Sequence, residues 1–234
     1  MAISIDTVYQ KVLMIANKEQ RGYITPQEFN LFADHAQKEI FEQYFYDLNQ
    51  VKRVHGNSGE YSDIIDNIRE KITPFEKSTT IVGNTNPKSI NTSDLYRLGT
   101  VRAGGVNGIE VEEVQENELL YLYQSPLTKP TTTRPIYVRT SDTQVSIYPP
   151  NLGVQAQCTY IKKPSTPSWG YFIVGNKALY DSSNSKTTDF ELHASEESEL
   201  VYKILKLAGI TLNKPGLSQS ALNLEESKAQ KEKQ

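Results

Sequence analysis

The histidines are the side chains in this sequence with the most versatile chemistry, because an imidazole binds metal ions and exchanges protons near neutral pH. They stand at positions 35, 55 and 193, in three separate predicted elements. None belongs to an HExxH pattern or pairs with a cysteine at the spacing of a metal site. We therefore predict that the chain binds no metal ion.

Loops that bind phosphate and motifs that activate a nucleophile are the next candidates. The sequence holds neither a GxxxxGK[ST] loop nor a GxSxG elbow. Gly104 and Gly105 fall in a predicted hairpin loop, where glycine permits the turn, and not between a strand and a helix. The one cysteine, Cys158, lies in an alternating strand and is predicted to be a small buried side chain without a disulfide partner. We expect no organic cofactor and synthesis in a reducing cytoplasm.

Two pairs of adjacent glutamates could in principle act as an acid and a base. Glu112 and Glu113 lie in a predicted strand, whose neighbouring side chains point to opposite faces, so they cannot flank one substrate bond. Glu196 and Glu197 follow Ser195 at a predicted helix start, where negative charge stabilises the positive end of the helix. With no catalytic constellation in sight, we predict that the chain is not an enzyme.

The charge and composition exclude further classes of function. The formal net charge is −3 and the pI is about 5.7, which disfavours a protein that reads nucleic-acid sequence. No basic leader and no long apolar run occurs, so we expect a soluble protein that neither spans nor binds a membrane. The 14 tyrosines suit either half-exposed contacts with another chain or tyrosine-rich strands, and both alternatives stay open.

Helical periodicity dominates the N-terminal third. Ile5, Val8, Val12 and Ile15 predict an apolar stripe on a helix over residues 4–17. Thr25-Pro26-Gln27-Glu28 reads as a capping box that starts a second helix of about 23 residues. A third helix is predicted from Glu60 to Lys71, ending before Pro74.

The second helix carries an aromatic cluster that is too wide for one face. It consists of Phe41, Tyr44, Phe45 and Tyr46. Such a cluster suits either the core of the monomer or a contact with a neighbouring subunit. The core is the favoured interpretation, and the subunit interface stays open.

From Thr79 to Tyr180 the pattern changes to short β-rich runs separated by turn residues, which predicts an antiparallel meander. The expected strands cover residues 95–102, 109–114, 135–140, 144–148 and 154–162, with an edge strand at 171–174 and one or two helical turns at 116–124. The fold class is thus α+β, with a β-domain inserted between helical parts.

The C-terminal part returns to helix. A fourth helix over Ser195–Ala208 has one apolar stripe, and we predict that it packs beside the second helix. The tail from Ser218 to Gln234 is polar and is predicted to stay mobile until a partner orders it, with Leu217, Leu222 and Leu224 as apolar anchors. The predicted divisions are 1–76 helical, 77–187 β-rich, 188–212 a helix that returns to the helical body, and 213–234 the tail.

The order of these elements resembles a known family. The resemblance rests on three runs: QRGYITPQEFNLFADHAQKEIFEQYFYDLNQ, VSIYPPNLGVQAQCTYIKKPSTPSWGY and DFELHASEESELVYKILKLAGITLN. Together they resemble virion structural proteins of tailed bacteriophages, in particular the head-to-tail connector proteins of short-tailed and crAss-like phages, which are adaptor or ring subunits. The resemblance spans about residues 4–212 and includes no catalytic motif.

The resemblance implies a homo-oligomeric ring of about twelve copies beneath the portal protein, in the neck or tail of the virion. The helices would form the ring body, the β-domain would face the next tail component, and the tail after Gly216 would dock on the portal. Double-stranded DNA would pass through the lumen, where an acidic lining repels phosphates. The alternatives are a tail-associated hydrolase without recognisable motifs and a capsid decoration or binding protein.

Overall fold

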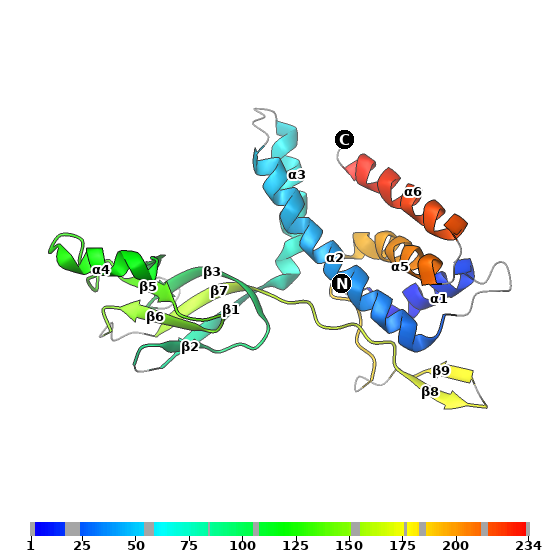
Figure 1. Cartoon of the computed structure of the whole chain (residues 1–234), viewed down its shortest axis with the longest axis horizontal. Coiled ribbons are helices and arrows are strands. Elements are labelled where there is room, and N and C mark those ends of the chain that lie inside the picture. The colour runs from blue at the N-terminus through cyan, green and yellow to red at the C-terminus, as the bar shows by residue number, and fades with distance from the viewer. Residues whose placement is uncertain are drawn as a thin grey trace. The chain divides into compact units, whose positions relative to one another are not determined.

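The structure is a computed structural model that describes residues 3–16, 24–53, 59–83, 85–104, 108–150, 155–175, 177–182, 186–211 and 215–232, without the side chains of residues 52–62, 210–217, 229, 231 and 232. The chain is α+β, as predicted, and forms two compact units (Figure 1). The helical unit comprises residues 1–74 and 164–234, and the barrel unit comprises residues 75–163. The β-rich unit therefore ends at residue 163 and not at the expected residue 187.

Helix α1 (Ile5–Ala16) buries the stripe that its periodicity predicts, apart from its last member. Ile5, Val8 and Val12 are fully buried, whereas Ile15 is 42% exposed. Ile15 lies at the edge of the stripe, and Ala16 takes the buried position at the end of the helix.

Helix α2 (Pro26–Arg53) starts with the predicted capping box. The Thr25 amide donates to Glu28 Oε2 over 2.9 Å, and the Glu28 amide donates to Thr25 Oγ1 over 3.3 Å. The Thr25 hydrogen bonds also lower the pKa of Glu28, which keeps its carboxylate ionised at the positive end of the helix. The cap thus sets the first residue of the longest helix in the unit.

Helix α3 (Gly59–Ile72) packs against α2 and agrees with its predicted bounds to within one residue at each end. A short 3₁₀ turn, η2 (Thr73–Phe75), follows it. Strands β8 (Tyr171–Val174) and β9 (Lys177–Tyr180) pair only with each other in the described part of the chain, as an antiparallel hairpin in the helical unit. The expectation that residues 171–174 form an edge strand of the main sheet is wrong, because their pairing partner is the next segment of the chain.

Helix α5 (Glu197–Thr211) packs against α2, which confirms the predicted pairing of the fourth helix with the second. Its buried apolar side chains are Leu200, Val201, Ile204, Leu205 and Ala208. The 3₁₀ turn η3 (Ala194–Glu196) precedes it. The residue that caps this turn is His193, whose Nδ1 accepts from the Ser195 amide over 3.3 Å, and not the predicted Ser195.

Helix α6 (Pro215–Glu232) spans the tail that was predicted to stay mobile until a partner orders it. It lies along α5 in the same chain (Figure 1). The prediction counted only apolar residues as a source of stabilisation. Charged residues of α6 also form ion pairs with buried partners, which local sequence does not reveal.

The barrel unit is a seven-stranded closed sheet in the order β1-β2-β6-β5-β4-β3-β7. Its strands are β1 (Glu76–Val82), β2 (Lys88–Ile90), β3 (Leu95–Ala103), β4 (Ile109–Glu113), β5 (Ile136–Arg139), β6 (Gln144–Tyr148) and β7 (Ala156–Lys162). Strands β3 to β7 lie close to predicted runs, whereas β1 and β2 were not predicted as strands. The expectation of an antiparallel meander is wrong, because β4 pairs with β5 in parallel. Helix α4 (Glu116–Gln124) lies within the crossover that a parallel pair requires.

The barrel core is formed by alternate residues of these strands. Its members are Ile81, Ile90, Leu95, Val101, Ala103, Val111, Tyr137, Val145, Ile147, Ala156, Cys158 and Tyr160. Cys158 is 2% exposed, as predicted, and burial raises the pKa of its thiol to about 11. At neutral pH the thiol is therefore protonated, which does not favour a nucleophile.

Among the helices in the described residues, none has both the length and the apolar character needed to cross a bilayer.

Candidate interaction surfaces

The histidines that the structure describes lie in separate elements of the fold. His35 is exposed on α2, His193 caps η3, and His55 lies outside the described residues. Within the described ranges, no three His, Cys, Asp or Glu side chains are close enough together to hold a metal ion. The described histidines therefore do not share a site with one another.

The glutamates of the strand pair, Glu112 and Glu113, each have a structural partner. Glu112 lies 3.4 Å from Arg134, and Glu113 accepts a hydrogen bond of 3.0 Å from the Tyr137 hydroxyl. Burial and the bond to Glu113 raise the pKa of Tyr137, which therefore stays a donor at physiological pH. The carboxylates of adjacent strand residues bind different partners, in agreement with the prediction that they do not act as a pair.

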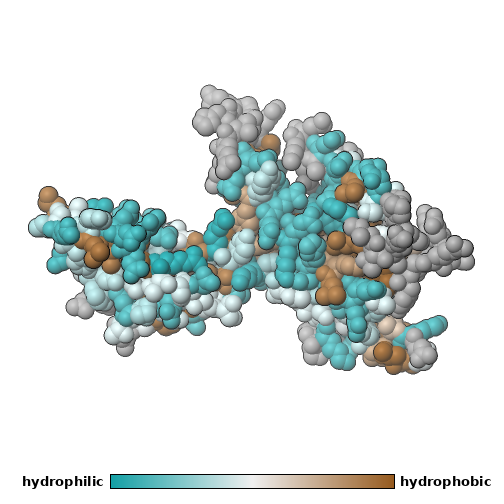
Figure 2. All heavy atoms as spheres, in the orientation of Figure 1, coloured by the Kyte–Doolittle hydropathy of each residue, from teal (hydrophilic) through white to brown (hydrophobic). Residues whose placement is uncertain are grey.

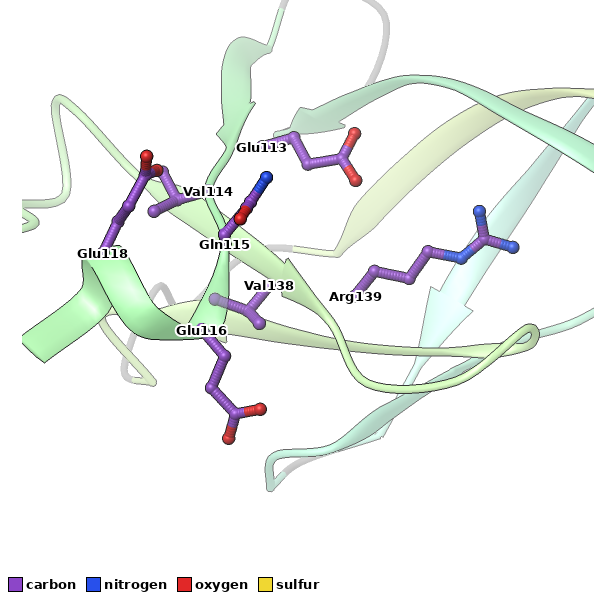
Figure 3. Close-up of a pocket in the computed structure, with 7 residues that line it drawn as sticks. All are labelled: Glu113, Val114, Gln115, Glu116, Glu118, Val138 and Arg139. Atoms are coloured by element: carbon purple, nitrogen blue, oxygen red, sulfur yellow. The ribbon is translucent and has the colours of Figure 1, made fainter.

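A pocket of about 500 Å³ lies where β4 passes into α4, beside β5 (Figure 3). Its lining consists of Glu113, Val114, Gln115, Glu116, Glu118, Val138 and Arg139. Figure 3 shows the three carboxylates pointing in different directions. General acid and base groups must converge on one substrate bond, and these groups do not. The pocket is a polar depression with no paired catalytic groups.

The β8–β9 hairpin exposes an apolar surface on the helical unit. Phe172, Ile173, Val174 and Leu179 are 44%, 69%, 55% and 44% exposed. Gly175, at φ +55°, follows β8 in the turn. Phe172, Val174 and Leu179 share one face of the hairpin, and Ile173 lies on the other face, because the side chains of a strand alternate. Exposed apolar side chains gathered in this way mark a candidate contact with another molecule. We name these four residues the hairpin patch.

Trp169 holds the base of the hairpin on the helical unit. Its ring stacks on Tyr171 and Tyr180, with ring centroids 5.9 and 5.8 Å apart. Its amide donates to Asn30 Oδ1 over 2.8 Å, and its indole nitrogen donates to Asp6 over 2.9 Å. Because an isolated two-stranded hairpin is marginal in water, this anchor stabilises the base and leaves the patch projecting.

Helix α4 and the turn after it expose a second apolar surface, on the barrel unit. Leu120, Tyr121 and Leu127 are 70%, 72% and 94% exposed, and α4 has no buried residue. Tyr123 meets Tyr148 of β6 edge-on, with centroids 6.1 Å apart, which attaches the helix to the barrel. Figure 2 shows brown residues over α4 and over the hairpin. We name Leu120, Tyr121 and Leu127 the α4 patch.

The aromatic cluster of α2 divides between the two interpretations left open. Phe41, Tyr44 and Phe45 are 2%, 5% and 7% exposed, so they belong to the core of the monomer. The Phe41 and Phe45 rings meet edge to face at 5.1 Å, and the Lys71 ammonium lies 5.9 Å from the centre of the Tyr44 ring. Tyr46 is 60% exposed and is the one member of the cluster available to a partner.

The proposed anchors of the tail do not form one surface in the described residues. Leu224 is 48% exposed, Leu222 is half-buried, and the side chain of Leu217 lies outside the described residues. Ala221 is the buried α6 residue among those whose side chains are described. Leu224 is thus the anchor that another protein can reach.

Sequence reasoning missed the hairpin patch, although a signal for it existed. Residues 171–174 and 177–180 are two four-residue runs separated by Gly175-Asn176, which is a spacing typical of a tight hairpin. The anchoring role of Trp169 had no such signal, because its partners come from positions 6 and 30.

No family model matches the chain, and no curated protein matches it either.

Proposed function

We propose that this chain is a structural subunit of a head-to-tail connector ring in a tailed bacteriophage. In this role it sits beneath the portal in the neck of the virion, joins the capsid vertex to the tail, and forms part of the channel for double-stranded DNA. The ring contains about twelve copies, to match the portal. The chain acts through its surfaces and performs no catalysis.

The observation that carries the proposal is that each compact unit presents its own exposed apolar patch. The hairpin patch lies on the helical unit and the α4 patch on the barrel unit. In a closed ring the contacts between subunits are heterologous, so each subunit needs two different surfaces, one for each neighbour. Two dissimilar patches supply such a pair, or one patch serves the ring and the other the next component of the tail.

The net charge supports the passage of DNA. A chain with a net charge of −3 weakly repels phosphates, and a ring of such chains lets the duplex slide where a basic lining would hold it. The proposal therefore includes non-specific contact with DNA, without recognition of its sequence.

Native mass spectrometry and negative-stain microscopy of the full-length protein, alone and with its portal protein, test the proposal. We expect a ring on the portal with one copy per portal subunit. A protein that stays monomeric with the portal present contradicts the connector role. Binding to the capsid faces, with no binding to the portal, would identify a decoration protein instead.

A further inference from the structure

Helix α6 is attached to the helical unit mainly through charge. Glu225 of α6 lies 2.7 Å from the Lys203 ammonium and 3.3 Å from that of Lys206. Lys228, one turn further on, lies 3.1 Å from Glu196 and 3.2 Å from Glu199. Two side chains of α6 therefore meet four charged partners on η3 and α5.

These partners are buried, so their charges need compensation. The side chains of Lys203 and Glu196 are 2% and 1% exposed, and that of Glu199 is 11% exposed. An ionised group at such a site costs several kcal/mol unless an opposite charge lies beside it. The ion pairs with α6 contribute part of that compensation.

Each of these buried charges also has a second partner that does not belong to α6. Lys203 lies 2.8 Å from Glu39 of α2 and 3.8 Å from Glu199 within α5. Glu196 lies 2.7 Å from Lys71 of α3. If α6 leaves, Lys203, Glu196 and Glu199 each keep an opposite charge nearby. The usual penalty for breaking a buried ion pair, an orphaned charge, is thereby reduced.

Among the side chains that the structure describes, the apolar part of the α6 contact is small. Ala221 is the buried α6 side chain among those described, and Leu224 is half exposed. The two helices approach closely at Gly209, where an added Cβ would lie 2.9 Å from the Ser218 backbone nitrogen. Close backbone contact and ion pairs, with little apolar burial, are typical of an interface of low local stability.

We propose that α6 is a charge-held clasp, which opens from α5 while the rest of the helical unit stays folded, and which closes again through the same ion pairs. The clasp is a property of this chain and holds whether or not the chain forms a ring. When it opens, it frees the faces of α5 and α6 that cover each other in the closed state.

The pKa values of Glu225 and Lys203 agree with the geometry of the clasp. Eight charged groups face one another here: Glu39 of α2, Lys71 of α3, Glu196 of η3, Glu199, Lys203 and Lys206 of α5, and Glu225 and Lys228 of α6. Burial raises the pKa of Glu225, but Lys203 and Lys206 outweigh it and lower the pKa overall. Burial lowers the pKa of Lys203, but Glu225 and Glu39 outweigh it and raise the pKa. Both shifts favour the ionised, closed clasp at neutral pH.

Hydrogen–deuterium exchange of the full-length protein, read by peptide, tests the clasp. In the unaltered protein we expect amides of residues 218–230 to exchange about tenfold or more faster than those of residues 200–208. Glu225→Gln should accelerate exchange in α6 by a further factor of about ten and leave residues 200–208 unchanged. Gly209→Ala tests the same opening through a steric change, and its expected effect is likewise confined to α6.

Glu226→Gln is the matched control, because Glu226 is the neighbouring residue of α6, carries the same charge and is exposed. It should leave the exchange of α6 unchanged. Equal exchange of α6 and α5 in the unaltered protein overturns the proposal, since it means that the two helices unfold together. An unchanged α6 in Glu225→Gln, or equal acceleration of α5 and α6, overturns it as well.

Discussion

The indole nitrogen of Trp169 donates a hydrogen bond to Asp6 Oδ1 over 2.9 Å, across 163 positions of sequence. Asp6 lies in the first turn of α1, and Trp169 precedes the β8–β9 hairpin. The same indole packs on Tyr9, with ring centroids 4.4 Å apart. The contact therefore ties the start of the chain to the segment that returns from the barrel unit.

This contact predicts the effect of removing the indole. Trp169→Ala should lower the free energy of unfolding of the helical unit by about 3–5 kcal/mol, because a buried aromatic ring and its hydrogen bond are lost. Circular dichroism during denaturant unfolding measures the change. Leu127→Ala is the control, since Leu127 is 94% exposed, and its effect should stay within about 0.5 kcal/mol. A similar small effect for Trp169→Ala would show that the indole is not an anchor.

Substitutions in the hairpin patch should impair assembly and leave folding unchanged. Ile173→Ser with Val174→Ser should change the free energy of unfolding by about 0.5 kcal/mol or less, because both side chains are already exposed. The same variant should lose assembly on the portal or between copies, as measured by native mass spectrometry. Leu120→Ser tests the α4 patch in parallel. Normal assembly of all these variants would contradict the proposed function, because it would show that neither patch is needed for contact with a neighbour.

The α2 cluster predicts different outcomes for neighbouring aromatic residues. Phe41→Ala or Phe45→Ala should cost about 3–5 kcal/mol of monomer stability, because both rings are buried. Tyr46→Ala, one position from Phe45, should cost about 0.5 kcal/mol or less. Thermal melting of the monomer measures all three. Unchanged melting of Phe41→Ala would place that ring in a subunit interface.

Glu196 predicts a specific dependence of stability on pH. Burial raises its pKa, but Lys71 and Lys228 outweigh burial and lower the pKa from 4.5 to about 2. Its contribution to stability is therefore complete above pH 4.5 and is lost as the pH falls towards 2. Glu199 acts in the opposite direction, because burial raises its pKa, so its protonation at falling pH adds stability. The difference in unfolding free energy between the natural protein and Glu196→Gln isolates the first effect and should shrink between pH 4.5 and 2. A difference that is constant over this range contradicts the ion pairs.

A substitution of Leu224 tests whether α6 binds the portal. Leu224→Ser should leave monomer stability within about 0.5 kcal/mol of the natural protein, because the side chain is half exposed, and should weaken binding to the portal. Binding assays with the purified portal measure the effect, with Glu226→Gln as the control. Deletion of residues 218–234 should abolish the same binding. Normal attachment of the truncated protein would exclude α6 as a docking element.

Local signals predicted many elements of this fold, but not strands β1, β2 and β9. The capping box of Thr25 and Glu28 predicted the start of α2, because both hydrogen bonds are made within four residues. Alternation predicted the buried face of β7 with Ala156, Cys158 and Tyr160, because the side chains of a strand alternate with a period of two. Of the exposed apolar residues, the sequence predicted Tyr46 and Leu224 as contacts, but not the hairpin patch or the α4 patch.

Tertiary structure decided the relationships that depend on distant partners. The parallel pairing of β4 with β5 follows from closure of the barrel, to which all seven strands contribute, so no pair of neighbouring runs could reveal it. Glu196 lies in the first turn of η3, as predicted for a residue that stabilises a helix start, and it also forms ion pairs with Lys71 and Lys228, which lie 125 and 32 positions away. The contacts of α6 have the same origin: its few apolar residues gave no sign of them, but the buried side chains of Lys203, Glu196 and Glu199 pair with charges of α6. The strength of an ion pair depends on how far its surroundings exclude water, and that is set by the packing of the whole unit and not by the residues beside it in sequence.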